Sequence, residues 1–166
     1  MLVGLPGAGK TTVGRLVSAE LNAPFADPDQ EIVRRTGLSV PALFAARGES
    51  GFRELEREVM SELLEAPPRI IAPGGGWAAQ PGVLDDVAGR ALVIHLVVTP
   101  RTAHDRLGDA TGRPLLAGGV LRRLRELEAL RIPYYRQAET EVETDGRPPA
   151  KVAADVVALA RSQAGW

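Results

Sequence analysis

The chain has 166 residues, 45% of them hydrophobic and 25% charged, which suffices for one buried core and predicts a single domain. The net charge of -1 and a pI near 6.2 argue against nucleic acid or an anionic membrane as the main partner. The absence of cysteine excludes disulfides and thiolate metal sites, and two histidines make a zinc site unfavourable. If the protein binds a metal ion, the remaining choice is a hard cation with oxygen ligands, such as Mg²⁺.

The longest apolar run, residues 91–98, is interrupted by His95 and is far too short to span a bilayer. The chain has no repeats, no low-complexity tract and no linker long enough to divide it. We therefore expect a cytoplasmic protein, with neither membrane nor nucleic acid among its partners. We also expect it to act as a monomer.

A phosphate-binding loop is the first motif. Residues 4–11 read Gly-Leu-Pro-Gly-Ala-Gly-Lys-Thr, which matches G-x-x-x-x-G-K-[ST] without a mismatch. Glycines let successive backbone N–H groups surround a polyphosphate, and Lys10 would reach its β- and γ-phosphates while the Thr11 hydroxyl binds Mg²⁺. A glycine-rich turn is the alternative. The apolar pair before the loop and the helical spacing of residues 12–21 favour the strand, loop and helix that the motif requires.

Two carboxylates follow the next short strand. Residues 25–29 read Phe-Ala-Asp-Pro-Asp, directly after a helix break. Because the carboxyl ends of strands in an open α/β sheet meet at the ligand crevice, Asp27 and Asp29 should lie beside the phosphate loop. There they could hold Mg²⁺ through water or accept a proton from an attacking hydroxyl. An Asp can also cap a helix over residues 30–35, and for Asp29 both interpretations stay open.

The next segment predicts two helices. Gly37 ends the preceding helix, and Ser39 can cap a short one. A second helix should cover residues 48–65. Arg53 and Glu56 stand three apart on one of its faces, and spacing alone favours a surface ion pair of little energetic value.

Three consecutive glycines, Gly74 to Gly76, follow a strand of the buried type. They permit a tight turn and the close approach of a ligand to the backbone, which favours a substrate-facing edge over a flexible connection. A helix over residues 83–87 and a near-continuously apolar strand over residues 91–98 come next. We interpret His95 as a hydrogen-bonded core residue and His104 as a surface residue, and assign neither to catalysis.

Residues 106–119 combine glycine, proline and arginine without periodicity, which predicts a loop. Near a nucleotide, such a loop bearing Arg113 would be a lid that excludes water and places a cation on the transferred phosphoryl group. Taken alone, it could be any surface connection. The pattern then predicts a helix over residues 120–136, a strand exposed on one face over residues 139–144, and a final helix around residues 152–159.

Together these motifs resemble the shikimate kinase family over essentially the whole chain. Besides the phosphate loop, the ordered set that carries the resemblance is Phe25-x-Asp27-x-Asp29, Gly48-Glu49-x-x-Phe52-Arg53-x-x-Glu56, Gly74-Gly75-Gly76, Arg113-Pro114-Leu115-Leu116 and Arg131-x-Pro133-x-Tyr135. The departures are modest: Pro73 and Trp77 flank the triple glycine, and Val33 stands where the family often has an acidic residue.

The resemblance implies a three-layer α/β/α fold with a five-stranded parallel sheet, the nucleoside-monophosphate-kinase architecture of P-loop proteins. It implies one domain over residues 1–166, with a substrate-binding segment at about 28–60 and a lid at about 108–119. The implied reaction is phosphorylation of the 3-hydroxyl of shikimate by ATP, giving shikimate 3-phosphate and ADP, with Mg²⁺ as cofactor, in aromatic amino acid biosynthesis.

The resemblance also implies roles for the motif residues. Catalysis would fall to Lys10, Asp29 and Arg113. ATP would be bound by Gly7, Ala8, Gly9, Lys10, Thr11, Thr12, Arg106, Arg113 and Arg147, and Mg²⁺ by Thr11 and Asp27. Shikimate would be bound by Asp29, Arg53, Gly74, Gly75, Gly76 and Arg131, with Phe44 and Phe52 beside its ring. A pair of arginines suits a planar carboxylate, so the resemblance reverses the surface-pair interpretation of Arg53.

Two other functions stay open. A kinase for another small polyol acid, such as gluconate, would use the same phosphate loop without needing both motif arginines. The chain could also be a catalytically silent nucleotide-binding relative. A silent protein has no chemical reason to keep the full set of polar groups, namely Lys10, Thr11, Asp27, Asp29, Arg53, Arg113 and Arg131.

Overall fold

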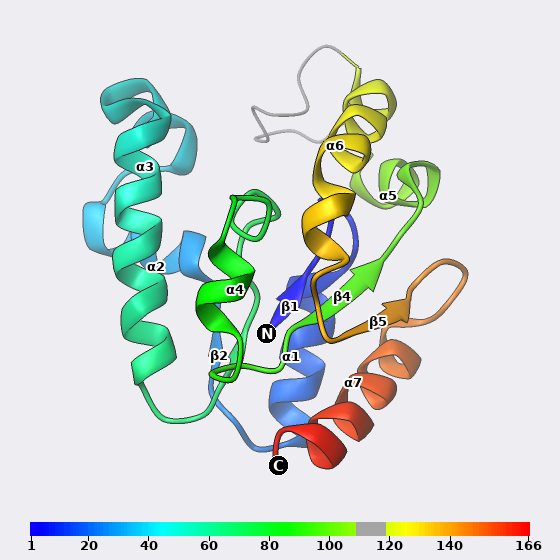
Figure 1. Ribbon diagram of the computed structural model, residues 1–166. Helices are drawn as coiled ribbons and strands as arrows, with labels where there is room; N and C mark the ends of the chain where they lie inside the picture. Colours follow the sequence, from blue (N-terminus) through cyan, green and yellow to red (C-terminus); the bar gives the residue numbers. More distant parts are fainter. Residues whose placement is uncertain (109–118) are drawn as a thin grey trace.

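The computed structural model describes residues 1–108 and 119–166, and its strands and helices form an α/β arrangement (Figure 1). The strands are β1 (Leu2–Val3), β2 (Phe25–Ala26), β3 (Ile70–Ile71), β4 (Ile94–Val97) and β5 (Thr140–Glu143). The helices are α1 (Lys10–Glu20), α2 (Pro28–Thr36), α3 (Val40–Glu65), α4 (Val83–Val87), α5 (Pro100–Leu107), α6 (Val120–Tyr135) and α7 (Pro149–Gln163). The predicted α/β class is confirmed, and every strand pairing is parallel.

The predicted single sheet of five strands is wrong. In the described residues, β1, β4 and β5 form one sheet in the order β1-β4-β5, and β2 pairs only with β3. A single sheet would need a ladder between β1 and β3, and each of these strands has only two residues. Gly4 leaves β1 at a φ of +142°, and Pro73, which has no N–H to donate, follows β3 closely. The two strands are therefore too short to form a ladder of hydrogen bonds with each other.

Strand β4 is the centre of the larger sheet. Its Ile94 is in register with Leu2 on one side and with Thr140 on the other. The His95 ring is buried and its Nδ1 lies 3.1 Å from Glu141 Oε1 on β5, which confirms the predicted hydrogen-bonded core histidine. Burial on both faces explains why this strand reads as a continuous apolar run.

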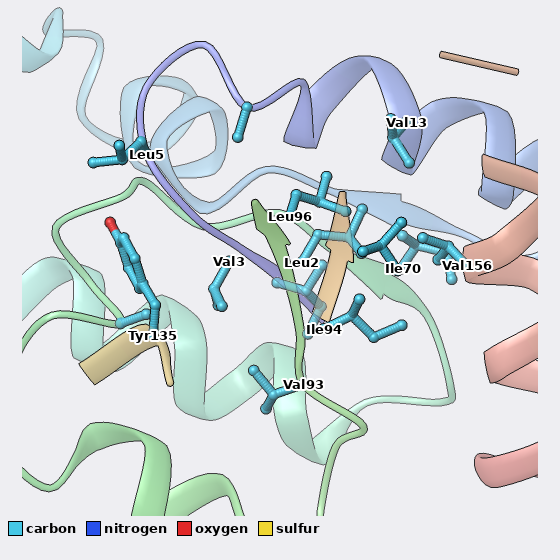
Figure 2. Close-up of a cluster of buried hydrophobic side chains, with 14 of the residues drawn as sticks. Leu2, Val3, Leu5, Val13, Ile70, Val93, Ile94, Leu96, Tyr135 and Val156 are labelled. Carbon is cyan, nitrogen blue, oxygen red and sulfur yellow. The ribbon is translucent and has the colours of Figure 1, made fainter. Parts of the chain in front are cut away.

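Two hydrophobic clusters hold the elements together. The larger one joins β1 and β4 to α1, α6 and α7 (Figure 2). The smaller one consists of Ile32, Leu43, Phe52 and Val59 and holds α2 against α3. In Figure 1, α3 stands on one side of the strands, and α5 and α6 stand on the other. Of the helices in the described ranges, none is both long and apolar enough to cross a membrane.

Helix α2 has clear local signals at both ends. The Asp27 side chain caps it by accepting a hydrogen bond from the Gln30 N–H at 3.3 Å, and Pro28 occupies the first turn. Gly37 ends it in the left-handed conformation at a φ of 69°, as predicted. The cap is therefore Asp27, while Asp29 lies in the first turn near the positive end of the helix.

The two helices predicted between residues 39 and 65 are joined into α3, which breaks at Gly48. Ser39 caps α3 by accepting a hydrogen bond from the Ala42 N–H at 3.3 Å, as predicted. Gly48 has a φ of 67° and a ψ of −178°, a conformation essentially restricted to glycine. The break redirects the backbone just before the Phe52-Arg53-x-x-Glu56 motif.

Candidate active site

A cleft of about 1020 Å³ lies where the chain leaves β1, β2 and β3, the edge at which open parallel sheets bind ligands. Almost all predicted site residues line it: Gly7, Ala8, Gly9, Lys10, Thr11, Thr12, Asp27, Asp29, Phe44, Phe52, Arg53, Gly74, Gly75, Gly76, Arg106, Arg131 and Arg147. Arg113 lies outside the described residues. Segments far apart in the sequence therefore meet at one site.

The loop between β1 and α1 turns through three glycines with positive φ, Gly4 at 142°, Gly7 at 84° and Gly9 at 91°. A Cβ on Gly7 would lie 2.8 Å from the Ala103 carbonyl oxygen, so α5 packs directly on the loop backbone. Gly9 is the N-cap of α1, whose first turn begins with Lys10 and Thr11. This arrangement presents backbone N–H groups and the positive end of a helix to the cleft, which suits an anionic ligand.

Lys10 and two possible metal ligands lie at the cleft. Lys10 Nζ donates to the Gly4 carbonyl oxygen at 2.8 Å and to the Leu5 carbonyl oxygen at 3.1 Å, so the ammonium group is held against the loop. Among the described residues, no three acidic or histidine side chains cluster to hold a metal ion. A cation bound by Thr11 and Asp27 would complete its shell with phosphate oxygens and water, as Mg²⁺ prefers. The residues present therefore fit Mg²⁺ bound together with a polyphosphate.

Two arginines from different parts of the chain reach the same cleft. Arg106 of α5 donates to the Gly7 carbonyl oxygen at 3.2 Å, to Thr144 Oγ1 at 3.0 Å and to the Thr144 carbonyl oxygen at 2.5 Å. It thereby ties the loop after β1 to the residue after β5. Arg147 donates to Asp155 Oδ2 at 2.7 Å. Both guanidinium groups are fixed by hydrogen bonds to the protein.

The three glycines after β3 are the meeting point of polar side chains from three helices. A Cβ on Gly74 would lie 3.0 Å from Asp29 Oδ2 of α2. A Cβ on Gly76 would lie 2.8 Å from Arg53 Nη2 of α3 and 3.4 Å from Arg131 Nη2 of α6. One carboxylate and two guanidinium groups thus converge on a stretch of backbone that leaves them room only because it has no side chains.

A buried carboxylate holds Arg53. Arg53 Nη1 donates to Glu56 Oε2 at 2.6 Å, and Glu56 is only 1% exposed, so the surface-pair interpretation is wrong. Burial raises the pKa of Glu56 to about 7, although the charge of Arg53 and hydrogen bonds from Arg53 and Gln80 act in the opposite direction. Glu56 lies four residues from both Phe52 and Met60, on the buried stripe of α3, and this spacing is the sequence signal that identifies it.

An aromatic pair forms an apolar wall beside these charges. The Phe44 and Phe52 ring centroids are 4.7 Å apart, and both residues line the cleft. The Arg53 guanidinium carbon lies 5.7 Å from the centroid of the Phe52 ring. The wall gives this part of the cleft one apolar side and one charged side, which suits a small amphiphilic anion.

The three departures from the family pattern fall in different places. Pro73 and Val33 line the cleft, whereas the Trp77 side chain is 3% exposed and belongs to the larger hydrophobic cluster. The cleft also includes residues that sequence reasoning did not assign: Pro6, Val13, Gln30, Val40, Pro41, Glu56, Ala72, Leu107, Thr144 and Val152. Most are apolar residues next to a motif, and apart from Glu56 no residue type or spacing identifies them.

Known proteins resemble this chain over nearly its whole length. A family model described as shikimate kinase matches residues 6–161. A shikimate kinase of Pseudomonas savastanoi pv. phaseolicola is 43% identical over 165 residues, which cover 95% of this chain and 93% of that protein.

Solved structures agree with these matches. A shikimate kinase from Acinetobacter baumannii in complex with shikimate has a TM-score of 0.89 and 35% identity, and the match covers 97% of this chain and 91% of that one. A shikimate kinase from Aquifex aeolicus has a TM-score of 0.85 and 34% identity, with 98% and 96% of the two chains covered.

Proposed function

Because this chain belongs to the shikimate kinase family, we propose that it transfers the γ-phosphoryl group of ATP to the 3-hydroxyl of shikimate, giving shikimate 3-phosphate and ADP in aromatic amino acid biosynthesis. The observation that carries this proposal beyond family membership is the convergence of Asp29, Arg53 and Arg131 on the triple glycine, in the same cleft as the phosphate loop.

The acceptor end of the cleft matches the chemistry of shikimate, a small ring with one carboxylate and three hydroxyls. Arg53 and Arg131 would bind the carboxylate, because guanidinium groups match the planar, forked geometry of a carboxylate. The Phe44 and Phe52 wall would pack against the ring. Asp29 would accept hydrogen bonds from ring hydroxyls and so select the hydroxyl that faces the phosphate loop.

The donor end would bind the triphosphate of ATP. The N–H groups of the loop and the start of α1 would surround the phosphates, and Lys10 would exchange its bonds to the Gly4 and Leu5 carbonyls for phosphate oxygens. Thr11 and Asp27 would hold Mg²⁺, which when bound neutralises charge on the β- and γ-phosphates. Arg106 and Arg147 would flank the adenine, and the resemblance adds Arg113 from the lid segment.

The transfer step itself needs little covalent chemistry from the protein. The 3-hydroxyl oxygen forms the new bond to the γ-phosphorus, the bond from that phosphorus to the bridging oxygen breaks, and ADP leaves. Asp29 orients the attacking hydroxyl and takes its proton. Positioning of the two reactants and stabilisation of the phosphoryl charge, chiefly by Lys10, supply most of the catalysis.

The test is ADP release from Mg-ATP, with shikimate, gluconate and nucleoside monophosphates as parallel acceptors. Stimulation by shikimate alone is the expected result. Stimulation by gluconate instead would assign a different polyol acid kinase. If the protein binds ATP but no acceptor stimulates ADP release, the proposal is contradicted and the protein is a catalytically silent relative.

We also infer that the protein acts as a monomer. Strand β5 is an edge of the three-stranded sheet, and its Glu141 and Glu143 are exposed. Charged side chains on an edge strand oppose pairing with a second copy through that edge. Light scattering on a size-exclusion column measures the mass in solution, and a dimer mass would overturn the inference.

A further inference from the structure

Tyr135 of the Arg-x-Pro-x-Tyr motif has no role in the reaction described above. It is the last residue of α6, and its side chain is the largest of the fully buried ones among the described residues, with 1% exposed. Figure 2 shows it within the larger hydrophobic cluster. A phenol at this depth needs a partner for its hydroxyl, and Tyr135 Oη donates to the Gly75 carbonyl oxygen at 2.6 Å.

The same hydroxyl lies beside Arg131. A Cβ on Gly75 would be 3.2 Å from Tyr135 Oη and 3.1 Å from Arg131 Nη1, so both polar groups approach one glycine. Burial raises the pKa of the Tyr135 phenol, and the charge of Arg131 and its hydrogen bond act in the opposite direction. A protonated phenol can accept from a guanidinium while it donates to a carbonyl. The hydroxyl can thus join Arg131 to the glycine turn.

The ring that carries this hydroxyl is itself fixed. Arg131 and Tyr135 are four residues apart on α6, which places them on the same face of the helix. The centroid of the Tyr135 ring lies 5.1 Å from that of the buried His95 ring, and the planes are inclined by 37°. His95 is in turn bonded to Glu141. The phenol therefore has little freedom to move away from the turn.

We propose that Tyr135 is a positioning residue whose hydroxyl fixes the Arg131 guanidinium relative to the Gly75 peptide and thereby sets the affinity for the acceptor rather than the rate of phosphoryl transfer. An arginine side chain has many rotamers, and ordering it on binding lowers affinity. A phenol that holds the guanidinium in place removes that cost before the acceptor binds. This inference rests on the proposed function, because it names the residue that prepares the carboxylate site.

The substitution Tyr135→Phe removes the hydroxyl and keeps the ring. The KM for shikimate should rise about tenfold, the usual scale of losing one such hydrogen bond, while kcat and the KM for ATP stay unchanged. The matched control is Tyr134→Phe, because Tyr134 is the partly exposed neighbour and is not among the described residues that line the cleft. The control should keep the wild-type KM.

Failure of the inference and failure of the proposed function give different results. A wild-type protein without ADP release stimulated by shikimate would overturn both. An active wild type with an unchanged shikimate KM in Tyr135→Phe would overturn the inference alone. A fall in kcat at unchanged KM would also overturn it, because the role would then be in the transfer step.

A double substitution tests whether Tyr135 acts through Arg131. In an Arg131→Ala background, adding Tyr135→Phe should cause no further loss of kcat/KM for shikimate, since the group that the phenol positions is already gone. If the double variant instead loses kcat/KM by the product of the two single-variant factors, the two residues act independently and the coupling is contradicted.

A second measurement does not depend on the folding of Tyr135→Phe. The chain contains two tyrosines, so in Tyr134→Phe protein a 3-fluorotyrosine label reports Tyr135 alone. Shikimate added without ATP should shift the ¹⁹F resonance. The shift should follow a saturation curve that is half-maximal at the dissociation constant for shikimate. A resonance that stays constant while calorimetry records shikimate binding would overturn the proposal.

Discussion

The free energy of unfolding should depend on pH through Glu56, and the substitution Glu56→Gln isolates that dependence. The carboxyl faces Arg53 on the same helix, Asp29 from α2 and Gln80 from the segment after the triple glycine. In the folded chain, burial raises its pKa from the usual 4.5 to about 7, because removal from water outweighs the attraction of Arg53. In the unfolded chain the same group is solvated. Glutamine has nearly the same shape and does not titrate.

The sign follows from proton binding. Between pH 4.5 and about 7 the folded chain binds a proton at Glu56 that the unfolded chain has released. The stability from this proton is fully present below pH 4.5 and is lost as the pH rises through the pKa of Glu56 in the folded chain, about 7. At about 1.4 kcal/mol per pH unit, the interval from 4.5 to about 7 corresponds to at most about 4 kcal/mol. The wild type should lose up to that amount relative to Glu56→Gln as the pH rises.

Urea unfolding of both proteins from about pH 4 to about pH 8 measures this difference. The buried Trp77 gives a fluorescence signal for the core. Glu49→Gln is the matched control, because Glu49 is the other carboxylate paired with Arg53 and its side chain is 71% exposed. Because the Glu49→Gln protein retains Glu56, its free energy of unfolding should depend on pH as that of the wild type does. A difference between wild type and Glu56→Gln that stays constant across this range would refute the reasoning.

Three further predictions concern the reaction. Lys10→Ala should lower kcat by at least about 10²-fold while shikimate binding by calorimetry is unchanged, and a near-normal kcat would remove Lys10 from the mechanism. Gly76→Ala places a Cβ 2.8 Å from Arg53 Nη2 and should displace that guanidinium, raising the shikimate KM about tenfold at an unchanged melting temperature; an unchanged KM would show that Arg53 does not contact the acceptor. Arg131→Lys keeps the charge but loses the fork, so the shikimate KM should rise about tenfold or more, and a wild-type KM would mean that a point charge suffices.

Features fixed by local chemistry were predictable from the sequence. The motif of the phosphate loop needs glycine at its first and sixth positions, and Gly4 and Gly9 do have positive φ. Gly37 and Ser39 end and begin helices because a left-handed residue and a hydroxyl satisfy backbone groups at helix ends. His95 was correctly placed in the core, since it interrupts an otherwise apolar strand.

Features fixed by long-range packing were not predictable. An Arg and a Glu three residues apart look the same whether exposed or buried. The spacing of Glu56 from Phe52 and Met60 places it on the apolar face of α3, but only the packing of that face buries the carboxylate. Either Asp27 or Asp29 could have capped α2, and the exact residue at which β2 ends made the choice. The strands separate into two groups because β1 and β3 are too short to pair with each other, and the composition of the chain does not predict the length of a strand.

Gly75 explains why the cleft depends on glycine rather than on any small residue. A Cβ there would lie 2.9 Å from the Gly4 carbonyl oxygen, at the root of the phosphate loop, and also within 3.2 Å of Arg131 Nη1 and Tyr135 Oη. The donor half and the acceptor half of the proposed site therefore meet at one residue through backbone contact. Side chains can change rotamer, whereas a backbone contact between two turns has far less freedom. In the proposed site, the main chain would therefore set the distance between the phosphates and the acceptor, and the surrounding side chains would bind and orient them.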